Sequence, residues 1–536
     1  MKQKSSNSYR IIDLVEHVSE EINGILRSNL YETSLDKEDI TTLRRRKSEL
    51  RLALRNCGIG DAYAKKYVKQ VIRKILLSRF VKDVSDYEKY IPFSSPDSLS
   101  ARDKFDIVLY YLELEHGEQA LSYMLEEYVL NERTDAHMGI AVTEQCMEEI
   151  YYDLNIYLSS VDKLNILVQR VYSQYKGLGV VDEIRDMKLE GVSGGVSGGE
   201  GQYDNVWILY NGLNIHMQCL SFEDETELER ICMNIYRYGS PGQLSKSKGY
   251  IVNEMKDHSR IVVVRPPFAE SFAFFVRKFD TIESKKVTEL ITDDGKELVE
   301  DVLRFIVRGC QVAAITGAQG SGKTTLLMSL IEYIPPAYTM RIQETAFELH
   351  LRDIYPQRNI LTFQETEYVS GQEGLDIQKK TDGVVNILGE ISTNDVAAWM
   401  IQMSQVASLF TLFTHHAKTT EHLIKYMRNA LIVTGRFNSE TIALEQVVAA
   451  IRFDIHTEKD IYGHRYIERV SEIVRVDSKG GYMIRDILRY TKEGYKLVGA
   501  FSDDTASDML KHMGKEDVER FYETFGVQDK QGFSSN

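Results

Sequence analysis

The sequence predicts an α/β protein whose C-terminal half contains a parallel sheet flanked by helices, after a smaller α+β domain and a helical N-terminal extension. Three changes of pattern along the chain indicate this plan. Apolar residues recur at threes and fours over residues 1–164, short β-branched and aromatic runs follow over 165–282, and strands alternate with helices over 283–515. Residues 516–536 form a predicted C-terminal tail. With 536 residues, 43% of them hydrophobic, the chain can bury a core in each of two or three domains.

Composition argues against several classes of protein. The formal net charge of −15 repels phosphate backbones, so no nucleic-acid partner is expected. The five cysteines are far apart and form no C-x-x-C pair, so neither a disulfide framework nor a zinc knuckle is indicated, and a reducing cytosol fits. The first residues lack the apolar run of a secretory signal, and no apolar stretch approaches the ~20 residues that cross a bilayer. We therefore expect a cytoplasmic protein that reaches a membrane through its partners.

The N-terminal extension is predicted to be helical, and the run Phe105–Leu130 is a good example of its periodicity. Within it, Thr41–Lys82 carries thirteen Lys or Arg residues and only two acidic ones. Long cationic side chains commonly decorate exposed helix faces, which favours a solvated surface. Contact with anionic lipid or an acidic partner is the alternative interpretation.

The α+β domain is indicated by four short strand-like runs: Val206–Tyr210, Ile215–Leu220, Ile261–Arg265 and Phe272–Phe279. Before them, Gly191–Gly199 is a doubled Gly-Ser unit that is poor in side chains, so we expect a loop there rather than a phosphate-binding turn. Polar residues at 280–286 predict a linker to the next domain.

The decisive motif fits G-x-x-x-x-G-K-[ST] at every fixed position. It follows the apolar strand Val312–Thr316 and precedes the helical run Thr325–Ile334, which is the context that a phosphate-binding loop needs. Backbone N–H groups converge on phosphates in such a loop, a lysine reaches the β and γ phosphates, and a hydroxyl ligates Mg²⁺. The sequence therefore predicts a site for ATP and Mg²⁺ in which Thr324 is the metal ligand. Its nucleotide-binding residues are Gly317, Ala318, Gln319, Gly320, Ser321, Gly322, Lys323, Thr324 and Thr325.

A second acidic position is predicted after the hydrophobic run Val384–Leu388. This strand delivers Glu390 to the carboxyl edge of the sheet, where α/β folds bind their ligands. Glu390 can then orient or polarise an attacking water; a charge near a helix N-terminus is the plainer alternative. No [NT]-K-x-D pattern occurs, which disfavours guanine and leaves adenine as the expected base.

Several further segments share one order with a known family. They are Gly177–Glu183, Gly239–Pro241, Ser259–Phe268, Val276–Phe279, Arg469–Ile473 and Arg485–Tyr490. With the phosphate-binding loop, they make the chain similar to the secretion ATPases of type II and type IV systems. The likeness is greatest to the tight-adherence (Tad/Flp) pilus assembly ATPases of the CpaF type, and spans about Leu164 to Gly514. The resemblance implies a RecA-like P-loop ATPase core and a PAS-like fold for the smaller domain.

The resemblance also implies roles for single residues. Arg260 and Arg277 match arginines that the family's N-terminal domain offers to the nucleotide phosphates. Glu344 matches the first carboxylate of the family's acidic box and pairs with Glu390, with the choice of base left open. His416 matches the histidine before alanine in the family's histidine box, where an imidazole can sense the γ-phosphate or bond the catalytic carboxylate. His415 is expected to be a neighbour of this site.

The chain departs from the family pattern at four places. Thr345 replaces an acidic residue, and Ala407-Ser408 replaces an earlier glycine-histidine pair. Glu367 and Ser392 stand where the family usually carries arginine. The changes at Glu367 and Ser392 remove positive charge beside the nucleotide or at subunit contacts, so slow turnover or compensation by another subunit's arginine is expected.

By resemblance, the protein is expected to be a homohexameric cytoplasmic ATPase that drives inner-membrane platform proteins and, through them, pilins. The basic helical extension would contribute to docking on the platform. Two other classes stay open. One is a nucleotide-binding scaffold that hardly hydrolyses, which the departures favour, and the other is a nucleic-acid translocase, which the acidic balance disfavours.

Overall fold

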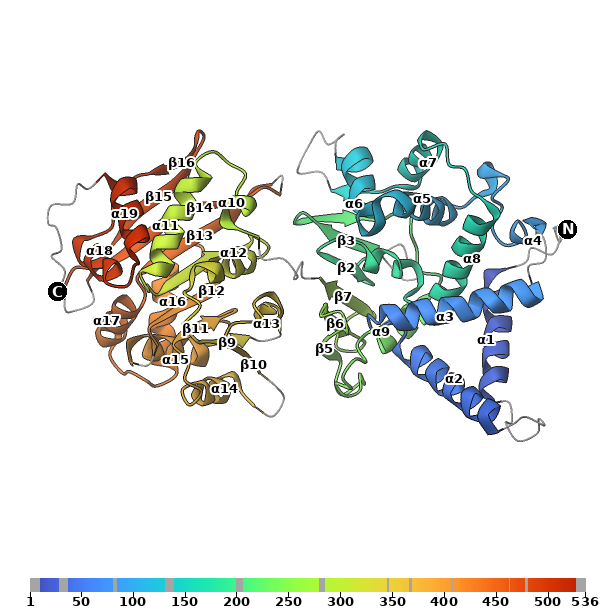
Figure 1. The fold of residues 1–536 in the computed structure, drawn as a ribbon, viewed down its shortest axis with the longest axis horizontal. Helices are drawn as coiled ribbons and strands as arrows, with labels where there is room; N and C mark the ends of the chain where they lie inside the picture. Colours follow the sequence, from blue (N-terminus) through green and yellow to red (C-terminus); the bar gives the residue numbers. More distant parts are fainter. Residues whose placement is uncertain are drawn as a thin grey trace. The chain divides into compact units, whose positions relative to one another are not determined.

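The computed structural model divides the chain into two compact units, Met1–Phe279 and Asp280–Asn536, and each is described by itself (Figure 1). The structure describes residues 10–27, 37–80, 84–130, 139–198, 206–278, 285–344, 347–365, 369–406, 408–461, 463–477 and 481–526. Most of the predicted linker at 280–286, the end of the predicted tail, and Thr345, Glu367 and Ala407 lie outside these residues. No helix in the described ranges has the length and apolar character of a bilayer span.

Helices of the first unit form a core of their own. Val18 of α1, Val68 of α3 and Leu167 of α8 are fully buried in this core. The side chain of Asp61 accepts a hydrogen bond from Ala64 N and caps α3. The helices of this unit are α1 (Ile11–Arg27), α2 (Lys37–Asn56), α3 (Ala62–Ile75), α4 (Val84–Tyr87), α5 (Ala101–His116), α6 (Ala120–Leu125), α7 (Glu144–Asp153), α8 (Ser160–Tyr175) and α9 (Glu225–Ile235).

A second core of this unit lies between a seven-stranded sheet and the helices α5, α6, α7 and α9. The sheet has the order β1 (Ile140–Ala141), β4 (Leu213–His216), β3 (Val206–Tyr210), β2 (Gly191–Gly194), β7 (Ala273–Arg277), β6 (Arg260–Val264) and β5 (Tyr250–Glu254). All neighbours are antiparallel except β1 and β4. Three of the predicted strands are confirmed as β3, β6 and β7. The fourth, Ile215–Leu220, is confirmed only at Ile215 and His216, where β4 ends. The helical prediction for Phe105–Leu130 is confirmed with a break at Gly117.

The prediction of a loop at Gly191–Gly199 is wrong for its first half. Gly191–Gly194 is strand β2, which pairs with β3 on one side and β7 on the other. A Cβ atom at Gly194 would lie 2.7 Å from the ring carbons of both Phe222 and Phe274. The absence of a side chain is therefore what lets these two rings pack against the strand, and it does not exclude the segment from the core.

One cation of the basic segment is used inside the unit. Lys65 Nζ on α3 lies 2.6 Å from carboxylate oxygens of both Asp182 and Asp186, and the Lys65 side chain is largely buried. These ion pairs join the helical extension to the α+β part of the unit. At this position, the expectation of a solvated basic face does not hold.

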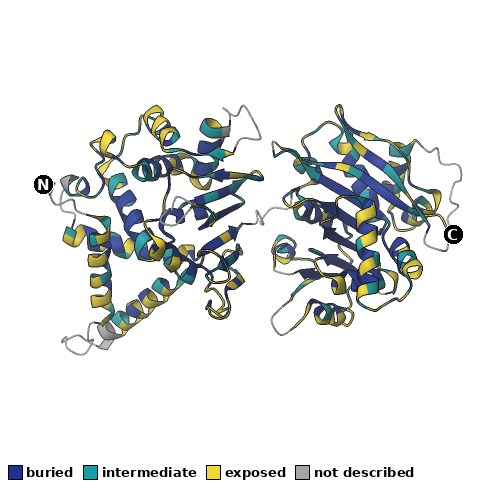
Figure 2. Ribbon diagram, turned by 180° about the vertical axis from the view of Figure 1, so that it is seen from behind, coloured by how far each residue is buried: buried dark blue, intermediate teal, exposed yellow. Residues whose placement is uncertain are grey.

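The second unit is built on a nine-stranded mixed sheet whose strands are mostly buried (Figure 2). Its order is β10 (Ile360–Gln364), β9 (Met340–Glu344), β11 (Val385–Leu388), β12 (Phe410–His415), β8 (Ala313–Gly317), β13 (Phe453–Lys459), β14 (Arg465–Arg475), β15 (Tyr482–Thr491) and β16 (Gly494–Leu497). The six strands from β10 to β13 are parallel, as predicted, and β14 to β16 continue the sheet in antiparallel fashion. The predicted parallel sheet is thus confirmed, and three antiparallel strands extend it at one edge.

Helices cover this sheet and complete its core. Phe521 of α19 lies 5.2 Å, between ring centroids, from Phe305 of α11, so much of the predicted tail packs on the unit. The helices are α10 (Val287–Leu290), α11 (Lys296–Arg308), α12 (Lys323–Leu330), α13 (Leu351–Ile354), α14 (Gly371–Gln378), α15 (Asn394–Val406), α16 (Thr420–Val433), α17 (Glu440–Ala450), α18 (Asp503–Leu510) and α19 (Lys515–Phe525).

Candidate active site

The phosphate-binding loop leaves the carboxyl end of β8, which lies between β12 and β13 in the sheet. Every residue of β8 is buried, and α12 begins at Lys323. Gly317 ends the strand with φ +143°, and a Cβ atom there would lie 2.1 Å from the Thr457 carbonyl oxygen. Only glycine lets the loop approach β13 so closely. The strand, loop and helix predicted from the motif are therefore confirmed.

Two hydroxyl groups fix the loop to β13. Thr457 Oγ1 donates to the Thr316 carbonyl oxygen at 3.0 Å. Ser321 Oγ donates to the Ala318 carbonyl oxygen at 2.8 Å and lies 2.8 Å from Thr457 Oγ1. The loop is thus held in shape by side chains of its own and of the neighbouring strand.

A buried carboxylate lies below the loop. Asp454 is fully buried, and its two oxygens accept hydrogen bonds from Thr316 Oγ1 and Thr420 Oγ1, both at 2.6 Å. Thr316 has a single hydroxyl proton, which it gives to Asp454. The Thr316 oxygen therefore accepts from His456 Nδ1 at 2.7 Å.

Lys323 uses all three of its N–H donors within the site. Its Nζ donates to the carbonyl oxygens of Gly317 at 3.0 Å and Ala318 at 2.8 Å, and lies 3.2 Å from His416 Nδ1. The side chain is buried, and burial lowers the pKa of Lys323 to about 8, against an opposing effect of the Glu390 charge. The loop therefore holds a cation that would gain from more negative charge.

His416 connects this lysine to Glu390. An ammonium group only donates, so Nδ1 of His416 accepts from Lys323 and the ring proton is on Nε2. Nε2 lies 3.1 Å from Glu390 Oε1 and donates to it. The structure brings three predicted site residues into one hydrogen-bonded line, Lys323 to His416 to Glu390.

Glu344 lies beside this line at the end of β9. Its Oε1 accepts hydrogen bonds from the backbone N–H groups of Glu348 at 3.0 Å and Leu349 at 2.9 Å. A Cβ atom at Gly389 would lie 3.0 Å from Glu344 Cγ, so the two carboxylates occupy adjacent strand ends. Glu344 is 4% exposed, whereas the Glu390 side chain is 40% exposed. Glu390 is accordingly the carboxylate that solvent reaches.

His415 has a structural position. Its Nδ1 lies 3.0 Å from the Ile391 carbonyl oxygen, and its ring centroid lies 4.3 Å from that of Tyr426. Burial lowers the pKa of His415, which favours the neutral ring. It is a neighbour of the site, as expected.

The two predicted arginines belong to the first unit. Arg260 on β6 and Arg277 on β7 are directly opposite each other in the antiparallel register, and both are half-buried. The sheet thus brings these two arginines together. They lie in the first unit, whereas the phosphate-binding loop lies in the second.

Sequence reasoning missed two cations close to the loop. A Cβ atom at Gly320 would lie 3.7 Å from Lys459 Nζ, and one at Gly322 would lie 3.7 Å from Arg465 Cδ. Lys459 ends β13 and Arg465 begins β14. Before Lys459, Phe453 and Ile455 alternate with polar residues. This strand-like pattern, which ends at the same sheet edge as β8, is the signal that could have found it.

The residues present fit a nucleotide with a divalent cation. The left-handed conformations of Gly320 (φ +77°) and Gly322 (φ +91°) shape the loop, and cationic side chains surround it. The carboxylates of Glu344 and Glu390 and the Thr324 hydroxyl, in the first turn of α12, supply the oxygen donors that Mg²⁺ prefers. The arrangement can hold phosphates and place a carboxylate next to them.

No protein-family model and no curated protein matches the chain. Solved structures of secretion and pilus ATPases are similar to it at low identity, and three of them serve as examples. The VirB11 ATPase from the Brucella suis type IV secretion system, in complex with sulphate, is 18% identical over 54% of this chain and 94% of its own, with a TM-score of 0.30. The Legionella pneumophila ATPase DotB is 14% identical over 66% and 87%, with a TM-score of 0.38. The pilus retraction motor PilT with bound ADP is 14% identical over 66% and 89%, with a TM-score of 0.39.

Proposed function

We propose that the chain is an ATP hydrolase with a RecA-like P-loop core. The observation that carries this proposal is the line from Lys323 through His416 to Glu390 at the carboxyl edge of the parallel sheet. A lysine that meets phosphates and a carboxylate that meets water are the two groups that phosphoryl transfer to water needs. Here one imidazole joins them.

The lysine is prepared to exchange partners. On nucleotide binding, Lys323 would replace its bonds to the Gly317 and Ala318 carbonyl oxygens by bonds to the β and γ phosphates. Burial lowers the pKa of Lys323, so this cation would gain from added negative charge in the free loop. Phosphate oxygens supply that charge, so the binding energy is largely electrostatic.

Glu390 is the proposed base for the attacking water. It is accessible to solvent, and the Nε2–H of His416 fixes its orientation. Glu344, whose carboxylate already accepts two backbone N–H groups, is proposed to shape the wall of the site. Mg²⁺, held through Thr324, would neutralise charge on the phosphates when bound.

The remaining parts of the proposal come from the resemblance to the Tad/Flp pilus assembly ATPases. Arg260 and Arg277, adjacent on β6 and β7, would supply positive charge to the phosphates. The chain would form a homohexamer in the cytoplasm, dock on inner-membrane platform proteins, and through them drive pilin assembly or protein secretion. The PAS-like fold of the smaller domain and the docking role of the helical extension belong to the same proposal.

Phosphate release by the purified full chain tests hydrolysis. Lys323→Ala is expected to lower the rate by at least ~10²-fold, because the loop loses its phosphate-binding cation. Lys418→Ala is the matched control: Lys418 is an exposed lysine of the same unit and is expected to leave the rate unchanged. Equal background rates for the wild type and Lys323→Ala would refute the hydrolase.

A nucleotide-binding scaffold is the second candidate, favoured by the exposed Ser392 that replaces the family's arginine after Glu390. The scaffold predicts tight binding of ATP with negligible phosphate release. A nucleic-acid translocase would instead show ATPase activity that DNA stimulates, and we expect none.

A further inference from the structure

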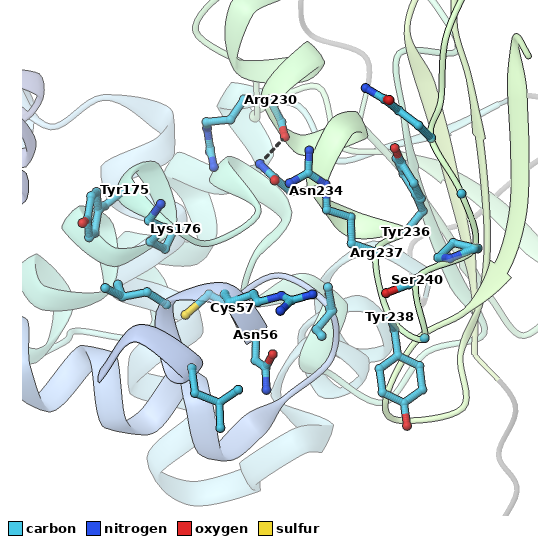
Figure 3. A pocket seen from close by; sticks show the side chains of 18 residues that line it. Asn56, Cys57, Tyr175, Lys176, Arg230, Asn234, Tyr236, Arg237, Tyr238 and Ser240 are labelled. Carbon is cyan, nitrogen blue, oxygen red and sulfur yellow. Dashed lines mark hydrogen bonds between the residues drawn. The ribbon is translucent and has the colours of Figure 1, made fainter. Parts of the chain in front are cut away.

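The first unit contains a cavity of about 820 Å³ that no part of the proposed ATPase site uses (Figure 3). It lies where the corner between α2 and α3 meets the C-terminal ends of α8 and α9 and the loop after α9. Its volume is in the range of small-molecule sites in proteins, roughly 300–1,000 Å³. The helical extension and the α+β part of the unit therefore share its walls.

The walls of this cavity carry positive charge only. Arg55, Lys176, Arg230 and Arg237 line it, and no Asp or Glu does. Within the described ranges, none of these four side chains forms an ion pair, although the chain as a whole has a net charge of −15. The carboxylates that act on Arg230 over a longer range, those of Glu227, Asp182 and Glu223, are absent from the walls. A concave surface of this kind concentrates a field that attracts anions.

Arg230 is fixed at this site before any ligand arrives. Its Nη1 donates to the Gly177 carbonyl oxygen at 2.9 Å and its Nη2 to that of Ser173 at 3.3 Å. Asn234 Nδ2 donates to the Arg230 carbonyl oxygen at 2.7 Å, as the dashed line in Figure 3 shows. Burial lowers the pKa of Arg230, so its charge is short of solvation. A guanidinium has five N–H donors, and these bonds leave others for a ligand.

The loop after α9 is also held in place. Asn253 Nδ2 on β5 donates to the carbonyl oxygens of Tyr236 at 2.6 Å and Tyr238 at 2.7 Å. The turn that follows contains Ser240 at φ +60° and Gly242 at φ +95°. Figure 3 shows Tyr236 and Tyr238 on this side of the cavity and Tyr175 on the opposite side. Rigid aromatic and amide side chains therefore accompany the cations, as in a preformed ligand site.

We propose that this cavity binds a small organic phosphate that carries a planar ring, such as a nucleotide. Arginine and lysine side chains would bind the phosphate groups, and the tyrosines would contact the ring. Because the ligand would touch both α2–α3 and α9, its binding would fasten the helical extension to the α+β part of the unit. This site is separate from the phosphate-binding loop and does not depend on ATP hydrolysis.

Pyridoxal 5′-phosphate tests the proposal on the full chain, because it combines a phosphate, a planar ring and an aldehyde. The aldehyde condenses with the amine of Lys176 to an imine with loss of water, and added borohydride supplies the hydride that reduces the imine to a stable amine. Peptide mass spectrometry then reads Lys176 and Lys323 separately. The exposed Lys418 of the second unit serves as the reference for intrinsic reactivity.

The measured quantity is the rate of modification of Lys176 divided by that of Lys418. We expect this ratio to be roughly tenfold higher for pyridoxal 5′-phosphate than for pyridoxal, which is the gain that one charge-assisted contact would give. Millimolar pyrophosphate is expected to remove this advantage, and the double variant Arg55→Gln, Arg237→Gln to abolish it. Arg55 and Arg237 are exposed, so the variant should fold. Equal relative rates for the two aldehydes, or no protection by pyrophosphate, would overturn the site.

Two further experiments are needed. The first distinguishes the contribution of the ring from that of the phosphate, and the second distinguishes this cavity from the phosphate-binding loop. AMP is expected to protect Lys176 at a lower concentration than inorganic phosphate does, and equal concentrations would overturn the role of the ring. Protection of Lys176 is expected to be the same in the Lys323→Ala variant. Protection that disappears in this variant would show that the ligand acts from the phosphate-binding loop, which overturns the separate site.

Discussion

The ammonium group of Lys323 lies 3.2 Å from Nδ1 of His416. This contact places an imidazole between the cation of the phosphate-binding loop and the carboxylate of Glu390. Loss of the γ-phosphate would change the partners of Lys323, and His416 is positioned to pass that change to Glu390. In the proposed function, the contact would couple the occupancy of the loop to the orientation of the base.

Replacing His416 by Gln should lower kcat while ATP binding persists. The amide can bond Lys323 or Glu390 but cannot accept and donate along the same line as the imidazole, and general acid–base positioning is worth roughly 10²-fold or more. Steady-state phosphate release and the binding of a non-hydrolysable ATP analogue provide the two measurements. His422→Gln, at an exposed position on α16, is the control and should behave as wild type. An unchanged kcat for His416→Gln would remove the imidazole from the mechanism.

ATP affinity should depend on pH through Lys323. Burial lowers the pKa of this group to about 8, and bound phosphates raise it, so binding favours the protonated form. Affinity should decline above pH 8, by up to about tenfold per pH unit. Titration calorimetry with an ATP analogue in buffers of different ionisation enthalpy should detect proton uptake. Lys323→Arg keeps its charge, and its affinity should stay flat over this range; a decline of the same steepness would mean that another group titrates.

Replacement by glutamine should lower kcat more at Glu390 than at Glu344. Glu390→Gln removes the proposed base and should lower kcat by about 10²-fold or more with ATP binding retained. Glu344→Gln keeps an oxygen that can accept from Glu348 N and Leu349 N, so its loss of kcat should be smaller. Single-turnover phosphate release measures both. A larger loss for Glu344→Gln would exchange the two roles.

Gly317→Ala should destabilise the second unit and weaken nucleotide binding. Its Cβ would meet the Thr457 carbonyl oxygen at 2.1 Å, and φ +143° strains any residue with a side chain. We expect a cost of about 1–3 kcal/mol in the free energy of unfolding. Gly514→Ala is the matched control, because no atom lies within 4 Å of a Cβ there and φ is −71°. Equal denaturation midpoints for the two variants would mean that the loop can move away from β13.

The local part of the site could be predicted from the sequence, and the long-range part could not. The motif ending at Lys323 and Thr324 is contiguous, and its flanking strand and helix follow from hydrophobic periodicity. The contact between Thr316 and Asp454 joins residues 138 positions apart, so no local pattern contains it. Lys459 and Arg465 were missed for the same reason: they approach the loop through the pairing of β13 with β8 and β14.

The error at β2 has a different origin. A Gly-Ser repeat has little apolar content of its own, so periodicity gives no strand signal at Gly191–Gly194. The signal lies in Phe222 and Phe274, whose rings need a backbone without a side chain in front of them. Strand propensity is a property of each residue by itself. Here the glycine fits the core because it leaves room for the rings of Phe222 and Phe274.

Asp454 has a mechanical consequence for the second unit. It lies on β13, and its two oxygens accept hydrogen bonds from a hydroxyl of β8 and a hydroxyl of α16. Separating these three elements would break two charge-assisted bonds in the interior, at about 1.5–3 kcal/mol each. We therefore expect β8, β13 and α16 to move as one rigid body if the unit changes conformation. Any hinge should then lie in segments that are not hydrogen-bonded to Asp454.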